Sequence, residues 1–539
     1  MDEPWIPVLD LSGRLREVSL RGLFADAGEL RMLACELPTQ SFAILRLALA
    51  ILHRATDGPP GETAWRELWK QPGLPLSDVE DYLAAFRDRF DLLHPERPFY
   101  QVADLQTAKG EVFGLERLIA DVPNGFPFLT TRAGTGMDRI SAAEAARWLL
   151  HCQAFDPSGI KSGAVGDARV KGGRGYPIGV GSAGSLGGVY LEGATLRETL
   201  LLNLVPTGPG LLASDARDLP VWEREPHGPS EEPATARGPF GVLSLYTWQS
   251  RRIRLNGDRH GITGAMVANG DKIEWQDRQL MEPLSVFGRS GPREREAKRV
   301  PIYLPRPHDH TRALWRGLET LLPPPASGGS EPPQRLSPLV MQWLARLRVH
   351  RVLGDDFTVT SRAVSITYGV QQATTSEVFG DSLTMNVQVV SGEAELRTTV
   401  VDSAGDAEEA VKVLRSLAAD LVRAAAGQGT DNGAADRAAA AAYAELDRHF
   451  RRWLARLGTG SDALAERRAW QRTVLKVVVR LGRDMIAAAG PAAAVGRVER
   501  DNGKDVHYCS AQAEAWFRRK IYKALELAFD TSAKEEVPA

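Results

Sequence analysis

The stretch Arg467–Asp484 reads RRAWQRTVLKVVVRLGRD. Its apolar residues recur at the spacing of one helix face: Val474, Leu475, Val478 and Leu481. This periodicity predicts an amphipathic helix that packs one face into a core. Basic residues recur on the other side at intervals of four, four, four and three: Arg468, Arg472, Lys476, Arg480 and Arg483. Residues at these intervals lie one above another, so the helix carries a basic face.

The basic helix lies in a C-terminal region rich in alanine, leucine and arginine, where strand signals disappear. Four helical segments are expected there, at 406–426, 434–457, 462–489 and 509–530. The breaks between them are short and polar or glycine-rich, which favours an up-down four-helix bundle. We therefore expect residues 405–539 to form a bundle domain.

Residues 1–404 mix helix and strand signals, so we expect a large mixed α/β domain and an α+β fold for the whole chain. Helices are expected at 39–55, 77–93, 141–153 and 196–204. Strands are expected at 242–246, 252–255, 357–370 and 383–401. Residues 289–299 are expected to form a charged loop, and the proline-rich residues 322–338 a linker.

Length and charge narrow the class of protein. A chain of 539 residues is too long for one compact core. Its net charge of −2 argues against a uniformly basic nucleic-acid coat but allows a local basic surface. Residues 440–524 hold 17 Lys and Arg against 9 Asp and Glu, which is +8 for this region.

The three cysteines stand far apart, at Cys35, Cys152 and Cys509, so neither a structural zinc site nor a disulfide framework is expected. This usage fits the reducing cytoplasm. The acidic N-terminus lacks the features of a signal peptide, and no segment is apolar enough to span a bilayer. We expect a cytoplasmic protein without a membrane partner.

Two motifs suggest chemistry without the context that the chemistry needs. Gly179–Gly184 matches GxGxxG, but no buried strand precedes it and no helix opens within it. His308-Asp309-His310 offers too few ligands for a metal, and the preceding Pro305 and Pro307 favour an exposed turn there. No nucleophile elbow or zinc-protease motif is present. We therefore expect no catalytic residues, no metal and no cofactor.

The basic face supports two interpretations. Its arginines could pair with acidic neighbours as an ordinary solvated face, or they could bind phosphates or an acidic partner. Only Glu466 and Asp484 are close in sequence, and both lie at the ends of the run. The stripe spans ~22 Å of helix, which is the reach of several phosphates on a strand.

A second region is unusual for its glycine. Residues 155–188 contain eleven glycines and several basic residues, with few bulky apolar ones. Ordering such a loop has a high entropic cost. Main chain without Cβ atoms can approach a partner where side chains would clash, so we expect this loop to make a close contact.

Several stretches, taken in order, resemble one family. They are Trp5–Val8, His94–Phe99, Ile160–Gly163 within the glycine loop, Leu200–Asn203 and Tyr368–Ala373. Together with the length and the terminal bundle, they look like the CasA-type large subunit of the type I-E CRISPR Cascade complex. The resemblance covers essentially the whole chain, with a poorer match over 206–350.

The resemblance implies a non-catalytic subunit that reads the protospacer-adjacent motif in double-stranded target DNA. It also implies help in opening the duplex to start an R-loop, and recruitment of a Cas helicase–nuclease. The other partners it implies are the remaining Cascade subunits and, through them, the CRISPR guide RNA.

The resemblance also assigns residues. Gly159 and Ser158 lie at the tip of a loop that enters the minor groove, and Gln371, Gln372 and Ala373 form a wedge beside the motif. Lys272 follows a turn signal, Asn269-Gly270-Asp271, and is expected to enter the groove from a hairpin. A loop at 128–139 is expected to contact the guide or the complex, through Phe128, Thr130 and Arg132. The basic face is expected to bind strand phosphates.

Two other functions remain open from sequence. The chain could be an interaction scaffold whose basic helical face binds a partner subunit instead of DNA. It could also be a nucleotide-dependent enzyme that uses the GVGSAG segment, residues 179–184.

Overall fold

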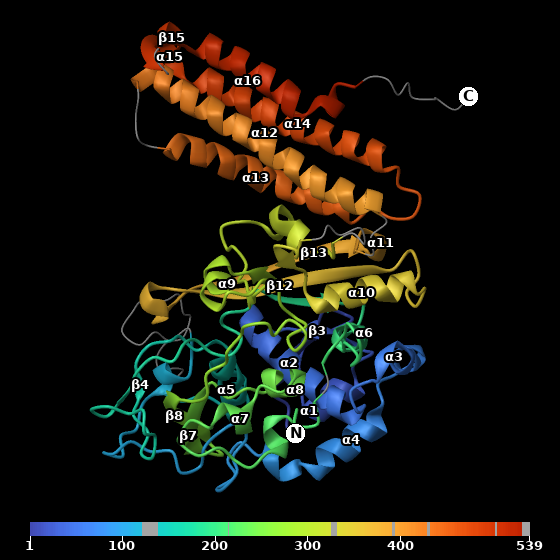
Figure 1. The fold of residues 1–539 in the computed structure, drawn as a ribbon, viewed down its shortest axis with the longest axis vertical. Helices are drawn as coiled ribbons and strands as arrows, with labels where there is room; N and C mark the ends of the chain where they lie inside the picture. Colours follow the sequence, from blue (N-terminus) through green and yellow to red (C-terminus); the bar gives the residue numbers. More distant parts are fainter. Residues whose placement is uncertain are drawn as a thin grey trace. The chain divides into compact units, whose positions relative to one another are not determined.

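The computed structural model describes residues 1–120, 138–213, 215–324, 331–390, 394–427, 432–501 and 504–530. These residues divide into two compact units. The first comprises Met1–Thr311, Ser327–Val352 and Val359–Ser382, and the second comprises Arg312–Ala326, Leu353–Thr358 and Leu383–Ala539. The mixed helix and strand content of the first unit and the helical second unit confirm the expected α+β class (Figure 1).

Helix α2 (Pro38–Ala55) forms the centre of the first unit, and its residues Thr39–His53 are all buried. Pro38 starts the helix, where its missing N–H costs nothing. The one charge in its apolar run, Arg46, is neutralised by an ion pair with Glu282 at 2.8 Å. Helices α5 (Ala142–Phe155), α4 (Leu76–Ala85), α6 (Leu196–Asn203) and α8 (Val242–Tyr246) pack on α2.

Small sheets surround this helical centre. The N-terminal sheet has the order β2-β1-β3, and a second sheet has the order β13-β12-β6. Strands β7 and β8 form a long hairpin, β4 pairs with β5, and the third three-stranded sheet has the order β10-β9-β11. The strand bounds are β1 Ile6–Asp10, β2 Leu15–Val18, β3 Leu30–Leu33, β4 Lys161–Ser162, β5 Arg174–Gly175, β6 Gly188–Glu192, β7 Arg251–Asp258, β8 Gly261–Asn269, β9 Phe287–Arg289, β10 Tyr303–Pro305, β11 Arg335–Leu336, β12 Thr358–Tyr368 and β13 Thr375–Asn386.

Four long helices lie alongside one another in the second unit (Figure 1). They are α12 (Ala394–Ala426), α13 (Gly433–Leu454), α14 (Ala463–Ala488) and α16 (Ser510–Ala524). An aromatic cluster locks their core: Phe450 stacks on Trp315 at 4.6 Å, and Trp470 stacks on Trp453 at 5.5 Å between ring centroids. Trp315 belongs to a 3-10 segment, Leu314–Thr320, which explains why residues far upstream join the helical unit.

Several expected elements differ from those found. Residues 242–246 form helix α8 instead of a strand, because Gly241 starts a turn and the Asp218 carboxylate accepts the N–H groups of Leu243 and Ser244. The expected charged loop at 289–299 contains helix α9 (Gly291–Ala297), whose Glu294 binds Arg289 of the preceding strand β9. A short apolar or charged run does not distinguish these alternatives.

The expected strand at 383–401 is also wrong for most of its length. Strand β13 ends at Asn386, whose side chain accepts the N–H of Gln388 and turns the chain into α11 (Val387–Val390). Helix α12 then begins at Ala394, so the expected domain boundary at 404/405 falls inside a helix. Residues 490–505, expected as a glycine-rich or polar break, instead hold α15 (Gly490–Val495) and most of the hairpin β14–β15 (Arg497–Asp501, Lys504–Tyr508).

The remaining helices are α1 (Leu20–Ala25), α3 (Gly61–Lys70), α7 (Ala234–Arg237) and α10 (Leu339–Val349). Across the described ranges, no helix combines the length and the apolar character that crossing a membrane requires.

Candidate nucleic-acid interface

The glycine loop meets the Gln371–Ala373 segment in the first unit. Helix α5 ends before Asp156, and the chain turns through Ser158 and Gly159 into β4. The Ser158 N–H donates to the Gln372 carbonyl at 2.7 Å. The main chain of Gly159 lies against Ala373, because a Cβ built on Gly159 would be 3.4 Å from the Ala373 carbonyl oxygen. Residues more than 200 positions apart in the chain therefore form one surface.

The Gln371–Ala373 segment is the tip of a finger formed by β12 and β13, with a 3-10 turn at Val370–Gln372. The Gly369 N–H closes the tip by donating to the Thr374 carbonyl at 2.9 Å. Gln371 and Gln372 both have left-handed backbones, with φ of 54° and 57°. Such residues cost on the order of 1 kcal/mol each, and they concentrate at functional sites. Val370 beside them is 86% exposed.

Arg251 on β7 holds the base of the glycine loop. Its guanidinium donates to the carbonyls of Pro157 at 3.0 Å and Gly179 at 2.8 Å, and its Nε binds the Asp156 carboxylate at 2.5 Å. The arginine side chain is only 1% exposed. One planar, fully charged group thus fixes both ends of the loop that begins at Asp156.

Asp156 is a buried carboxylate shared by two cations. Its Oδ2 lies 2.5 Å from Lys161 Nζ as well as from Arg251 Nε. Burial alone would raise the pKa of Asp156, but the charges of Lys161 and Arg251 together hold the pKa below its usual value. Burial lowers the pKa of Lys161. Asp156 therefore stays ionised and binds the loop to the hairpin.

Sequence reasoning did not find Arg251 or Asp156 as functional residues. Lys161 was noted only as part of the Ile160–Gly163 stretch that carries the resemblance, and its side chain is committed to Asp156. The one available signal is the pair of arginines at 251–252 within a strand pattern, since a charge on the inner face of a strand needs a buried partner.

The glycines at residues 172–188 differ in how tightly the surrounding structure packs against them. Gly172 and Gly173 lie in open space with positive φ, as a loose loop would have. A Cβ on Gly181, in contrast, would lie 2.5 Å from the Phe155 nitrogen, and a Cβ on Gly184 or Gly187 would overlap the Tyr368 hydroxyl or the Arg306 carbonyl. These three glycines allow close packing on α5 and neighbouring segments.

Lys272 does not follow a hairpin turn. The turn between β7 and β8 lies at Arg259 and His260, and Asn269–Asp271 continue the ladder, with Gly270 N–H donating to Ser250 and Asp271 N–H to Gln249. The turn signal fails because Asp271 is buried against Arg252 at 2.9 Å. Lys272 is half exposed and binds Glu274 at 2.7 Å. The expected loop with Phe128, Thr130 and Arg132 lies outside the described residues.

The basic face of α14 in the second unit divides into paired and unpaired charges. Arg468 binds Asp530 at 2.9 Å, and Arg480 binds Asp484 at 3.2 Å and also Glu445. The other three members are exposed and form no ion pair with any described residue: Arg472, Lys476 and Arg483. Three cations are therefore available for an external anion.

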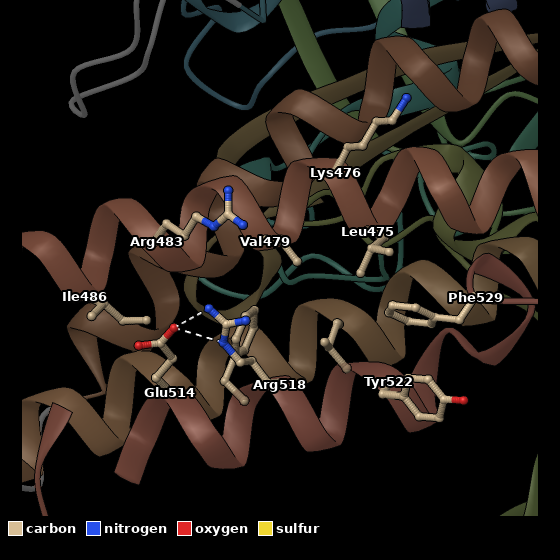
Figure 2. A pocket seen from close by; sticks show the side chains of 11 residues that line it. Leu475, Lys476, Val479, Arg483, Ile486, Glu514, Arg518, Tyr522 and Phe529 are labelled. Carbon is tan, nitrogen blue, oxygen red and sulfur yellow. Dashed lines mark hydrogen bonds and ion pairs between the residues drawn. The ribbon is translucent and has the colours of Figure 1, made fainter. Parts of the chain in front are cut away.

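A groove of about 510 Å³ runs between α14 and α16 (Figure 2). Lys476 and Arg483 line it on the α14 side, and Arg518 and Tyr522 line it on the α16 side. The expected core stripe of α14 is only partly buried, since Val474 and Val478 are fully buried but the two leucines are not. Leu475 lines this groove, and Leu481 lines another groove, against α12 and α13.

The structure gives neither the GxGxxG segment (residues 179–184) nor His308-Asp309-His310 the surroundings that its suggested chemistry needs. The two-residue strand β5 ends at Gly175 and does not lead directly into the GxGxxG segment, and no helix opens within that segment. His308 bonds to the Gly188 carbonyl at 3.1 Å. Among the residues that the structure describes, one cluster has metal-ligand groups within 4.8 Å of one another: His227, Glu232 and Asp271. The Asp271 carboxylate already binds two buried arginines, Arg237 and Arg252, whose charges oppose a cation there.

These features define a two-unit α+β protein with a strained polar finger against a glycine loop and a basic helical face. Its first 481 residues match the family model for the CRISPR-associated protein Cse1. The chain belongs to the Cse1 family, which confirms the resemblance noted from the sequence.

Solved structures and a curated relative agree with this membership. Thermobifida fusca Cse1 is 43% identical, with 98% of each chain covered and a TM-score of 0.90. Acidimicrobium ferrooxidans Cse1 is 29% identical, with 97% of this chain and 98% of that chain covered and a TM-score of 0.80. The CRISPR-associated protein CasA/Cse1 of Thermus thermophilus is 32% identical over 332 residues, and the match spans 60% of this chain and 60% of that relative.

A chain of a CRISPR RNA-guided surveillance complex shares the fold at 19% identity, with 90% of this chain and 98% of that chain covered and a TM-score of 0.64.

Proposed function

We propose that this chain is the large, non-catalytic subunit of a cytoplasmic RNA-guided CRISPR surveillance complex of the Cascade type. In this role it reads the protospacer-adjacent motif in duplex DNA, helps to open the duplex beside the motif and recruits the helicase–nuclease. Its other partners are the remaining Cascade subunits and the guide RNA. Family membership and the shared fold of a surveillance-complex chain support this role.

The observation that carries the proposal is the hydrogen bond from Ser158 N–H to the Gln372 carbonyl. A motif reader that also opens DNA needs a groove-entering element and a wedge at one place. The hydrogen bond places the glycine loop and the finger tip side by side. The minor groove is ~6 Å wide, so bare main chain at Gly159 fits where a side chain would clash.

The finger tip has the properties of a wedge. Gln371 and Gln372 are exposed and polar, so they can stack on the end of a duplex and hydrogen-bond an unpaired base. The hydrogen bonds from Gly369 N–H to the Thr374 carbonyl and from Ser158 N–H to the Gln372 carbonyl hold this strained backbone in place, so the tip is formed before DNA arrives. Unstacking a base step costs about a few kcal/mol, and a preformed wedge reduces the ordering cost added to it.

Lys272, Phe128, Thr130 and Arg132 retain the roles implied by the resemblance. Lys272 is proposed to contact the groove; it follows a segment held by the glycine-rich region, since Arg169 donates to the carbonyl of Gly270 at 2.9 Å. The other three are proposed to contact the guide or the complex.

A randomised motif library tests the proposal. The assembled complex, with and without this subunit, is incubated with duplexes in which the bases beside a matched target are random, and bound duplexes are sequenced. We expect enrichment of a short motif only when the subunit is present. Equal enrichment in both samples would contradict the proposal.

A second candidate function, an interaction scaffold, is favoured by one observation. Arg468 and Arg480 already have acidic partners within the chain, which leaves fewer cations for strand phosphates than the stripe of five suggests. Charge reversal at Arg472 and Lys476 separates the two functions. Loss of DNA-strand affinity with normal subunit association supports strand binding, whereas loss of association supports the scaffold.

A further inference from the structure

The groove between α14 and α16 combines an apolar floor with exposed aromatic rings. Phe517 and Ile521 are buried at its base. Tyr522 is 59% exposed and Phe529 39% exposed, although both are large and apolar enough to be buried. Their ring centroids lie 4.7 Å apart at the same end of the groove (Figure 2). Two neighbouring rings therefore present aromatic surface to an external partner.

Cations share the groove lining with these rings, and Figure 2 shows Arg483 near Ile486 and Glu514, toward the end away from Tyr522 and Phe529. Lys476 and Arg483 extend from α14, and neither forms an ion pair with any residue the structure describes. Arg518 lies opposite and binds the lone acidic residue of the groove lining, Glu514, at 2.6 Å. The lining thus has three cations against one carboxylate, and the carboxylate is already neutralised. A partner that enters the groove must be anionic and must also have flat apolar groups.

Single-stranded nucleic acid has both properties in alternation. Its bases stack on aromatic side chains, and its phosphates bind the neighbouring cations. A duplex does not fit, because its bases are paired and stacked on one another. Lys476 and Arg483 are seven residues apart, ~10 Å along the helix, which spans more than one phosphate of a strand.

We propose that the α14–α16 groove binds unpaired bases of a single DNA strand, with Tyr522 and Phe529 as the stacking platform and Lys476 and Arg483 as the phosphate contacts. The choice of DNA as the strand rests on the proposed function, in which duplex opening exposes unpaired bases. The aromatic platform distinguishes this site from a purely electrostatic phosphate contact. An acidic amphipathic helix from a partner subunit is the competing occupant.

The test uses the full chain and fluorescence anisotropy at low salt. The probes are an oligothymidine of about 15 nucleotides, an abasic oligonucleotide with the same number of phosphates, and a duplex of equal length. The variants are Tyr522→Leu, which keeps apolar volume but removes the ring, and Lys476→Gln. Arg437→Gln is the matched control, since Arg437 is an exposed cation that lines the other groove of α14.

We expect the oligothymidine to bind about tenfold more tightly than the abasic strand. Tyr522→Leu should abolish this difference and leave the abasic affinity unchanged. Lys476→Gln should weaken binding of both strands and reduce the salt dependence. Arg437→Gln should change neither affinity, and all variants should melt at the same temperature as the parent chain.

Equal affinity for the oligothymidine and the abasic strand would overturn the inference, as would unchanged base-dependent binding by Tyr522→Leu. Loss of subunit association by Tyr522→Leu, with strand binding intact, would identify the groove as a protein contact and would also overturn it. The motif library measures sequence discrimination in duplexes, so its failure would leave base-dependent binding of single strands by this groove measurable.

Discussion

Glycines in the loop at residues 155–188 occupy their positions for different physical reasons. At Gly181, Gly184 and Gly187 the protein itself fills the space that a side chain would need. At Gly159 it does not: the nearest atom to a built Cβ is 3.4 Å away, which is an ordinary contact, and the residue does not have a left-handed φ. The fold therefore explains the glycines at these three positions, whereas under the proposed function Gly159 is kept bare for the DNA groove.

In a glycine-rich segment, the glycines that the fold requires can be distinguished from those kept for recognition of a partner. A glycine that the fold requires is identified by the clash its Cβ would make, whereas a glycine kept for a partner has room for a Cβ at ordinary contact distance and a normal backbone. Substitution should therefore destabilise the protein at Gly181 and impair binding at Gly159.

The largest effect on stability is expected from Gly181→Val. Its side chain would clash with the main chain of Ala154 and Phe155, which cannot move without unravelling the end of α5. We expect a loss of about 3 kcal/mol in the free energy of unfolding, measured by chemical denaturation. A stability within 0.5 kcal/mol of the parent chain, on the order of a neutral surface change, would remove the packing role of Gly181.

A smaller effect, on binding, is expected from Arg251→Lys. Lysine keeps the charge near Asp156 but cannot reach the Pro157 and Gly179 carbonyls together, so the loop loses its fixed position. We expect affinity for a motif-bearing duplex to fall about tenfold in the assembled complex, with normal subunit association.

Arg252→Lys is the matched control for Arg251→Lys. Arg252 is the next residue on β7, is equally buried, and donates to the Gly228 carbonyl at 2.9 Å and the Asp271 carboxylate at 2.9 Å instead of the loop. It should lower the melting temperature to a similar extent without weakening motif discrimination. Equal loss of discrimination by both variants would show a general structural role for the two arginines.

The smallest expected effect is the pH dependence of the free energy of unfolding that comes from His151 on α5, the helix that precedes the glycine loop. Burial lowers the pKa of His151, which bonds to Thr39 at 3.0 Å, to about 4. The unfolded chain protonates this histidine near ~6.5, so between these values the unfolded state binds more protons. The free energy of unfolding should therefore fall as the pH drops from about 6.5 to 4, by at most about 1.4 kcal/mol per pH unit for this group.

Chemical denaturation at pH 7 and pH 5 measures the pH effect. His151→Gln should flatten the dependence, and the remaining slope should include His53, whose pKa burial also lowers to about 4. A slope that His151→Gln leaves unchanged would show that His151 does not titrate as its burial implies.

The sequence predicted the parts of the fold that depend on long periodic patterns. Helices α2, α5, α13 and α14 begin and end within a few residues of their expected bounds, because apolar spacing and the Ser141 cap define them locally. Short apolar runs such as 242–246 were assigned wrongly, since only the tertiary contact with Asp218 determines their structure.

The candidate site shows the same limit. The resemblance named Ser158, Gly159 and Gln372, and the structure brings them together. No local pattern predicts that Arg251 would hold the loop, because its partners are carbonyls that come close only in the folded chain. Likewise, the basic stripe was visible in sequence, but its division into paired and unpaired charges depends on Asp530 and Glu445 from other segments.

Binding of a motif-bearing duplex to the assembled complex containing Gly159→Leu tests the central claim most directly, when the melting temperature of the same variant is measured beside it. We predict an unchanged melting temperature, normal assembly and a loss of duplex affinity of at least tenfold, on the order of 1.4 kcal/mol. Parent-like affinity with a bulky side chain at this position would contradict the claim that Gly159 is kept bare for the DNA groove.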